Sequence, residues 1–141
     1  MAKAKSAVFK PKCRLLFGLK NKKHLSSSMD SSDGLSTTLN EMSSQSKKKF
    51  VITSMPSEND VLEFGKSNKL NASDLILNSG EEYEIVATTS KSNLPKIKKD
   101  AKKYGVKIYE IGYVTKGRGV FYKKNGKFIR IKDGGWKHLK H

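Results

Sequence analysis

A turn with two carboxylates, followed at once by a helical pattern, constrains the fold of this chain more than any other feature. Residues 29–35 read Met-Asp-Ser-Ser-Asp-Gly-Leu. Three apolar residues then recur at helical spacing: Leu35, Leu39 and Met42. This spacing predicts a helix over residues 34–45. Asp30, Ser32 and Asp33 are therefore predicted to lie in the turn that opens the helix, where backbone N–H groups are unpaired and the helix dipole is positive.

The pattern of this turn has two interpretations. Asp and Ser are favoured N-cap residues, so the turn can be an ordinary helix cap. The same turn also suits a phosphate group, or two carboxylates that hold the metal ion of a metal–phosphate complex. Residue types and spacing leave both interpretations open.

The chain is strongly basic, which bears on the partners it can bind. Its 141 residues carry 29 Lys and Arg against 13 Asp and Glu, giving a net charge of +16. Such a charge favours nucleic acid or a polyanionic small ligand. Nearly all the cations are lysines spread through the chain, whereas arginine is the residue of bidentate base and phosphate recognition. A solvated lysine-rich surface therefore explains the charge equally well.

Several kinds of site and location are disfavoured by composition. Cys13 is the only cysteine, which excludes an intramolecular disulfide and a cysteine zinc cluster. His138 stands alone among lysines and is interpreted as a surface or packing residue, because metal sites need several converging ligands. Residues 1–12 lack the apolar run of a signal peptide, and no stretch approaches the roughly 20 apolar residues of a membrane span. We therefore expect a soluble, cytoplasmic protein with no membrane partner.

The length of the chain suits one domain, over residues 11–141, preceded by a basic, flexible lead-in at residues 1–10. The other predicted helices lie at residues 11–25, 57–68, 75–77 and 94–104. The predicted strands lie at residues 50–53, 83–88, 106–115, 120–123 and 127–131. An Asn-Gly pair at residues 125–126 predicts a hairpin turn between the last two strands. The serine triplet at residues 26–28 is interpreted either as a flexible linker or as small residues that allow a close approach.

A second stretch with candidate chemistry is residues 78–88, a turn followed by a strand. Glu81, Glu82 and Glu84 place three acids within four positions, which is costly unless cations lie nearby. The cluster is interpreted either as charge balance against surface lysines or as a binding turn for a cationic or hydrogen-bond-donating ligand. Gly80 would let the backbone of such a turn approach a ligand closely.

Two glycine-containing stretches near the C-terminus complete the candidates. The only tryptophan, Trp136, follows two glycines and is interpreted either as a lid over the last strands or as a stacking platform for a flat ligand. Residues 117–119 read Gly-Arg-Gly. This pattern is a weak phosphate-loop signal, because strands are predicted on both sides of it, so it is interpreted as a turn.

Four motifs of the chain, in this order, resemble a known family. They are M-D-x-S-D-G-L-x-x-x-L at residues 29–39, G-E-[DE]-Y-E-[LI] at 80–85, I-G-x-[VM]-T-x-G-x-G-V at 111–120 and G-[WY]-x-H at 135–138. From Pro11 onward the order is similar to the C-terminal domain of thiamine-monophosphate kinase, in the aminoimidazole-ribonucleotide synthetase superfamily. One departure is Ser79, where the family usually has glycine.

The resemblance implies a fold, a reaction and a set of site residues. The implied fold is α+β, with a mixed β-sheet and packed helices, and is distantly ferredoxin-like. The implied reaction is ATP- and Mg²⁺-dependent phosphorylation of thiamine monophosphate to thiamine diphosphate, in thiamine biosynthesis. Asp30 and Asp33 would bind Mg²⁺, and Ser32 would contact the phosphates of ATP. Glu81 and Trp136 would contact thiamine monophosphate.

The resemblance also implies that much of the family's active site is absent here. Members of the family are about twice as long, and their N-terminal domain carries further magnesium-binding aspartates, much of the ATP site and the dimer contacts. No equivalent Gly-Asp-Asp motif occurs in residues 1–28. We therefore expect this chain to be inactive by itself and to need a separate N-terminal half, or a homodimer, as partner.

Two other functions fit the sequence. One is a basic nucleic-acid-binding module, which would use the net charge of +16 and aromatic residues able to stack on bases. The aromatic candidates are Tyr104, Tyr113, Phe121 and Tyr122. The other is a non-catalytic remnant of the superfamily, with a regulatory or structural role beside a separate N-terminal half.

Overall fold

The computed structural model describes residues 14–56, 59–80 and 84–134. Its helices are α2 (Leu15–Asn21), α3 (Leu35–Ser46), α4 (Asn59–Ser67), α5 (Ala72–Asn78) and α6 (Leu94–Lys103). Its strands are β1 (Leu25–Ser31), β2 (Lys49–Ile52), β3 (Glu84–Thr89), β4 (Gly112–Thr115), β5 (Gly119–Lys124) and β6 (Lys127–Arg130).

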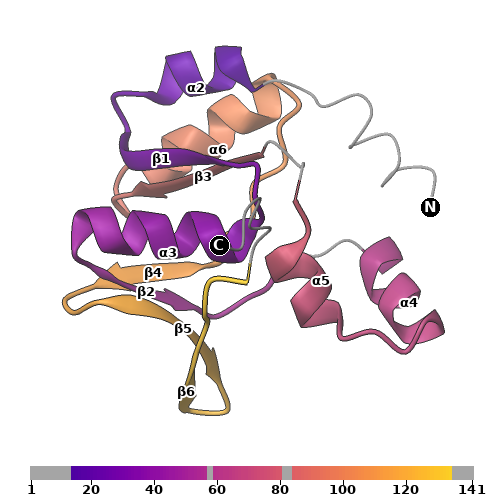
Figure 1. Ribbon diagram of the computed structural model, residues 1–141. Helices are drawn as coiled ribbons and strands as arrows, with labels where there is room; N and C mark the ends of the chain where they lie inside the picture. The colour runs from indigo at the N-terminus through magenta and orange to yellow at the C-terminus, as the bar shows by residue number, and fades with distance from the viewer. Residues whose placement is uncertain (1–13, 57–58, 81–83, 135–141) are drawn as a thin grey trace, which may run out of the picture.

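The strands form two sheets, one on either side of α3 (Figure 1). In the smaller sheet β1 pairs antiparallel with β3. The larger sheet has the order β4-β2-β5-β6, with β2 parallel to β5 and the other neighbours antiparallel. α2 and α6 cover the side of the β1–β3 sheet that faces away from α3, and α4 and α5 lie beside the layers. This arrangement confirms the expected α+β fold with a mixed sheet and packed helices.

α3 is central because its apolar stripe packs into the main core. The stripe residues Leu35, Leu39 and Met42 are all buried, as their spacing predicts. The other buried members of this core come from the larger sheet, α5 and the segment after β6: Phe50, Ile52, Leu77, Val120 and Ile131. Met29 of β1 and Val86 of β3 also pack against it, which joins the two sheets through α3. Full burial of one such leucine contributes about 1.5–3 kcal/mol.

A smaller core joins α2 to α6. Phe17 of α2 packs with Ile97 and Ala101 of α6. α6 has Pro95 in its first turn, and Gly105 follows its end with φ of +62°. Both features match the expected helix boundaries, since proline suits the start of a helix and glycine the left-handed position after its end.

Two sequence interpretations of strand positions are wrong. The serine triplet 26–28 is not a linker but lies within β1, because β3 supplies a pairing partner; Ser27 Oγ also lies 2.7 Å from Thr88 Oγ1. The long strand predicted at residues 106–115 is reduced to β4, because its partner β2 offers only four residues to pair with. The hairpin of β5 and β6 is confirmed, with Asn125 and Gly126 both at positive φ.

Candidate functional site

The two aspartates of the first motif flank the junction between β1 and α3. Asp30 is the penultimate residue of β1, and Ser32 and Asp33 form a bend before α3. Asp30 therefore lies in a strand rather than in the predicted turn, because it pairs with Ile85 of β3. The N-cap position of α3 is Gly34, which has no side chain with which to cap the helix. Neither aspartate thus serves as an ordinary helix cap.

Glycines hold this junction against the turn that precedes β3. Gly34 has φ of +99°, a backbone conformation that residues with a side chain rarely adopt. A Cβ atom on Gly34 would lie 3.2 Å from the carbonyl oxygens of both Leu77 and Ser79. A Cβ atom on Gly80 would lie 2.9 Å from the carbonyl oxygen of Ser32. The close approach expected of Gly80 is therefore made to the first motif, so the two predicted motifs contact each other.

The first turn of α3 binds a third segment, the one that follows β6. Ser36 Oγ donates a hydrogen bond of 2.8 Å to Asn78 Oδ1 and accepts one of 3.3 Å from the backbone N–H of Gly134. Thr37 Oγ1 donates a hydrogen bond of 2.7 Å to Asp133 Oδ1. Since the side chain of Ser36 is 0% exposed, these bonds satisfy a hydroxyl that water does not reach.

Three segments far apart in the sequence therefore meet at the N-terminal end of α3. We call this place the α3 junction, made of residues 30–37, 78–80 and 131–134; in Figure 1 it lies where β1 ends and the C-terminal segment passes α3. The first segment contains the three residues expected to bind metal and nucleotide. The other two expected site residues, Glu81 and Trp136, lie outside the described residues, one position and two positions beyond the other segments.

The donor groups at the α3 junction suit a hard cation. Asp30 and Asp33 are exposed and Ser32 is partly buried. Within the described residues neither aspartate takes part in a salt bridge, so both carboxylates can act as oxygen ligands of the kind Mg²⁺ prefers. Two carboxylates make only part of a metal site. Across the described ranges, no group of three or more His, Cys, Asp or Glu residues is arranged to hold a metal ion.

A charge pair borders the α3 junction. Glu84 lies opposite Ser31 in the β1–β3 ladder, and its two oxygens accept hydrogen bonds from Arg14 Nη2 at 2.8 Å and Arg14 Nε at 3.2 Å. The hydrogen bond to Glu84 raises the pKa of the Arg14 guanidinium above its ordinary value. Charge balance is therefore the role of at least this acid of the predicted cluster, with an arginine rather than a lysine as its partner.

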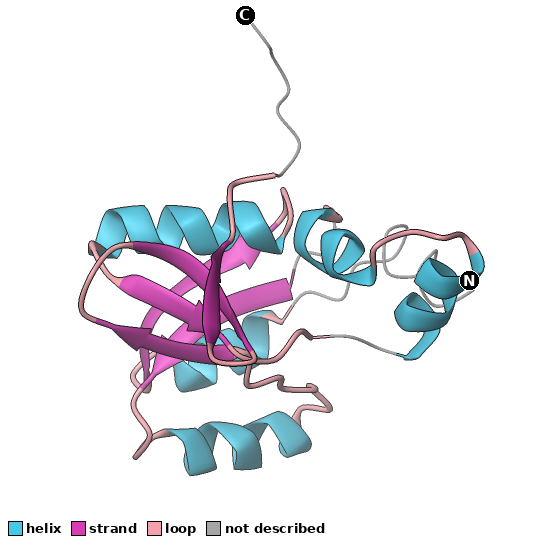
Figure 2. Ribbon diagram, turned by 90° about the horizontal axis from the view of Figure 1, so that it is seen from below, coloured by secondary structure: helices cyan, strands magenta, loops and turns pink. Residues whose placement is uncertain are grey.

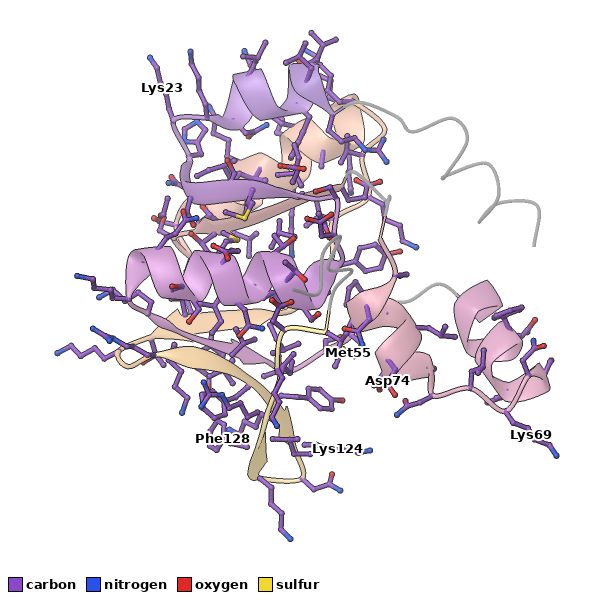
Figure 3. The ribbon with its side chains drawn as sticks, in the orientation of Figure 1. Lys23, Met55, Lys69, Asp74, Lys124 and Phe128 are labelled. Atoms are coloured by element: carbon purple, nitrogen blue, oxygen red, sulfur yellow. The ribbon has the colours of Figure 1, made fainter. Side chains whose placement is uncertain are left out.

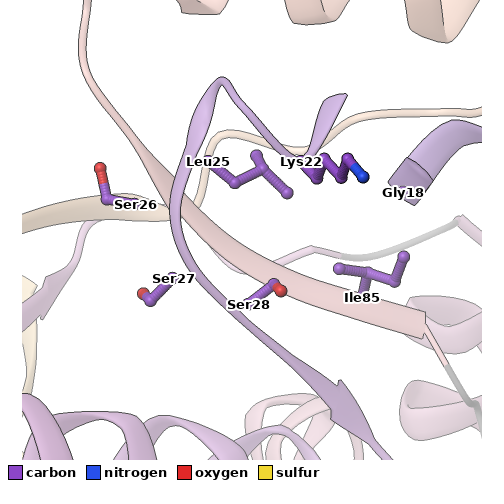
Figure 4. A pocket seen from close by; sticks show the side chains of 7 residues that line it. All are labelled: Gly18, Lys22, Leu25, Ser26, Ser27, Ser28 and Ile85. Atoms are coloured by element: carbon purple, nitrogen blue, oxygen red, sulfur yellow. The ribbon is translucent and has the colours of Figure 1, made fainter. Parts of the chain in front are cut away.

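A hollow of about 320 Å³ lies elsewhere, between α2 and the first half of β1 (Figure 4). Its lining consists of Gly18, Lys22, Leu25, the serines of residues 26–28 and Ile85. It contains no carboxylate, and none of the described residues expected to bind metal or nucleotide lines it. The hollow therefore lends no support to the expected site.

Sequence reasoning missed the residues that tie the α3 junction together. Ser36 and Thr37 stand at unspecified positions of the first motif, and Asn78 opens the second candidate stretch, but no role was expected of any of the three. For Ser36 and Thr37 the available signal was their type and position, since polar side chains in the first turn of a helix can bind neighbouring segments; Asn78, at the end of α5, offered no such signal. Which segments they bind depends on the packing of α3 against α5 and against the chain after β6.

Comparison with known proteins agrees with this architecture. Residues 6–124 match the family model described as "AIR synthase related protein, C-terminal domain". Because this match covers most of the chain, the chain belongs to that family.

Curated proteins with similar sequences include thiamine-monophosphate kinases. The chain is 54% identical over 140 residues to the one from Nitrosopumilus maritimus, covering 99% of this chain and 44% of the relative. It is 36% identical over 132 residues to the one from Pyrococcus horikoshii, covering 92% of this chain and 39% of the relative. The chain thus spans about two-fifths of the length of these relatives.

Solved structures share the fold. The crystal structure of tt0281 from Thermus thermophilus matches with a TM-score of 0.77 and 33% identity, over 86% of this chain and 39% of that one. The structure described as AaThiL complexed with AMPPCP and TMP matches with a TM-score of 0.74 and 29% identity, over 95% of this chain and 40% of that one.

Among the described residues, no helix is both long enough and apolar enough to cross a membrane.

Proposed function

We propose that this chain is the part of a thiamine-monophosphate kinase that holds Mg²⁺ and thiamine monophosphate during ATP-dependent formation of thiamine diphosphate. The observation that carries the proposal is the α3 junction, in which the segment with Asp30 and Asp33 packs directly on the turn that leads to Glu81. The segment that leads to Trp136 is bonded to the same helix end. The kinase relatives, and the complex of one structural neighbour with AMPPCP and TMP, support the assignment.

Charge neutralisation is the central requirement of the proposed reaction, because it brings the phosphates of ATP and the acceptor phosphate together. Mg²⁺, when bound, supplies that neutralisation. Asp30 and Asp33 would hold the ion between β1 and α3. Ser32, which lies between them, would donate its hydroxyl hydrogen to a phosphate oxygen of ATP.

The substrate side of the proposed site rests on Glu81 and Trp136. The thiazolium ring of thiamine carries a positive charge, so a carboxylate and an aromatic face both suit it. Glu81 directly follows Gly80, whose backbone packs on Ser32. A substrate bound by Glu81 would therefore have its phosphate close to the proposed metal ligands.

We further propose that residues 11–141 form one domain of the complete kinase and that the chain alone does not turn over substrate. The chain spans about two-fifths of the relatives' length, and the proposed ligands Asp30 and Asp33 supply two carboxylates where a metal–nucleotide complex needs more ligands. The missing ligands would come from another polypeptide segment, either a separate N-terminal half or the partner in a homodimer.

The test is a chimera in which this chain replaces the matching segment of the Nitrosopumilus maritimus kinase. We expect the chimera, but not the chain alone, to form thiamine diphosphate from thiamine monophosphate and ATP. Asp33→Asn in the chimera should lower kcat at least about tenfold, since even outer-shell changes around a metal cost that much. Asp74→Asn, an exposed aspartate on α5, is the matched control (Figure 3). A folded but inactive chimera, or full activity after Asp33→Asn, would contradict the proposal.

A further inference from the structure

The larger sheet has one face that no helix of the described residues covers. Phe50, Ile52 and Val120 point toward α3 and are buried in the main core, so alternate residues on each strand point the other way. Figure 1 shows no helix on that side of the sheet, and in Figure 2 its strands face the viewer. The outer-facing side chains used below are Lys49, Tyr113, Phe121, Lys123, Phe128 and Arg130. In the strand register Tyr113 and Phe121 flank the buried Val51 of β2, Arg130 lies opposite Phe121, and Phe128 lies opposite Lys123.

Aromatic rings and lysines alternate across this face, which we call the aromatic sheet face. Phe128 is 49% exposed and Tyr113 is 47% exposed, so their rings are open to solvent. Lys49 Nζ lies 4.6 Å from the centre of the Phe121 ring and 4.5 Å from the centre of the Phe128 ring. Lys123 Nζ lies 5.8 Å from the Phe128 ring centre. Figure 3 shows Phe128 and Lys124 on opposite sides of the β5–β6 hairpin.

The charge around this face has a single sign. Residues 42–57 and 111–132 together contain all four strands of the larger sheet and the turns at their ends. These two ranges carry three lysines and seven Lys or Arg, respectively, and contain no Asp or Glu. Elsewhere acids accompany the lysines: Lys98 of α6, for example, forms a salt bridge with Glu110. The larger sheet therefore carries a concentrated positive field, in which a polyanion is attracted to the face.

From this combination we propose that the aromatic sheet face binds single-stranded nucleic acid. The lysines and arginines would contact phosphates, while bases would stack on the exposed rings of Phe128 and Tyr113. A polyanion without rings would leave the aromatic side chains unused, and a duplex keeps its bases stacked inside, out of their reach. A second copy of the chain is disfavoured, because two faces of the same charge would oppose each other. This inference does not rest on the proposed kinase function.

The structure changes which aromatic residues can take part. Of the four candidates named from sequence, Tyr113 and Phe121 lie on this face. Tyr122 instead packs against the main core and Tyr104 against the smaller one, so neither is available for stacking there. Phe128 was not among the candidates and is the most exposed ring on this face.

The experiment is fluorescence anisotropy of labelled oligonucleotides of about 20 nucleotides, a length that covers a typical single-strand site. Oligo(dT), oligo(rU) and a duplex are titrated with the full 141-residue chain. Phe128→Leu keeps an apolar side chain but removes the flat ring, and should weaken single-strand binding at least about fivefold. Phe128→Tyr restores a ring and should bind within about twofold of the unmodified chain.

Two lysine variants distinguish binding at the aromatic sheet face from nonspecific electrostatic attraction to the whole chain. Lys123→Ala should weaken binding and reduce its salt dependence, whereas Lys99→Ala, which removes a lysine of α6, should do so much less. Circular dichroism checks that each variant is folded. Equal affinity for duplex, equal loss in the two lysine variants, or no loss in Phe128→Leu would each overturn the proposal. Equal binding of polyglutamate, or dimerisation through this face without oligonucleotide binding, would assign the face to another partner and overturn it as well.

Discussion

Replacing Gly34 by alanine should destabilise the α3 junction more than any other glycine-to-alanine change at a positive-φ turn of this chain. Gly34 has φ of +99° and ψ of 153°, a region that is essentially restricted to glycine and costs about 1–3 kcal/mol for other residues. The added Cβ would also lie 3.2 Å from two carbonyl oxygens, of Leu77 and Ser79. Forcing such a contact in a packed region costs about 1–3 kcal/mol more.

The two costs together predict a loss of about 2–6 kcal/mol in the free energy of unfolding, a large share of the stability of a small domain. Urea denaturation followed by circular dichroism measures this loss, provided that the m-value is unchanged. Gly126→Ala is the matched control. Gly126 also has positive φ, +76°, but a Cβ there meets nothing within 4 Å, so only backbone strain of about 1–2 kcal/mol is expected.

The difference between these two variants isolates the contact between the β1–α3 junction and the turn before β3. If Gly34→Ala costs no more than Gly126→Ala, the two turns do not pack against each other as described. The observation that places Asp33 beside Gly80 would then be wrong, and the proposed function would lose its structural support. A larger cost at Gly34 supports the packing, and the chimera activity test then addresses its functional consequence.

Three further changes test the fold around this site, each by urea denaturation. Leu39→Ala should cost about 2–5 kcal/mol, because Leu39 is 1% exposed in the core beneath α3; a cost below about 1 kcal/mol would contradict that packing. Ser36→Ala should cost about 0.5–1.5 kcal/mol, because it removes the part-buried hydrogen bonds that Ser36 makes with Asn78 and Gly134; Ser44→Ala, at an exposed position of the same helix, should cost little. Arg14→Ala should cost at most about 1 kcal/mol, because its partner Glu84 is half exposed, and a larger cost would show that this pair holds β3 in place.

The sequence predicts the elements whose pattern is local and strong. The three-and-four spacing of Leu35, Leu39 and Met42 gives α3 nearly to the residue. The Asn-Gly pair at residues 125–126 gives the β5–β6 hairpin, because that turn needs two residues at positive φ. Asn71, a residue type favoured at helix N-caps, caps α5: its side chain accepts a hydrogen bond from the backbone N–H of Ser73.

Strand identity was harder to predict where pairing outweighs local preference. Residues 26–28 are all serine and show no β-strand pattern, yet they form the middle of β1 because β3 lies alongside. Residues 106–111 do show an apolar, β-branched pattern but form no strand, because β2 ends at Ile52; the next residues, Thr53 and Ser54, both donate their backbone N–H groups to the carbonyl oxygen of Ile111. In both cases the deciding interaction lies more than 50 residues away, where a sequence window cannot register it.

The candidate site, too, was predictable from the sequence only in part. The sequence by itself named candidates for binding metal, phosphate and substrate, through side-chain chemistry and through motifs that resemble a known family, and these roles stay predictions. Only the tertiary structure decided that the first motif meets the turn at Gly80 and the segment 131–134, because that depends on glycines that let two backbone turns touch and on a buried serine that bonds both Asn78 and Gly134. It likewise decided which aromatic residues face solvent, since the side of a strand that packs on α3 is fixed by register rather than by composition.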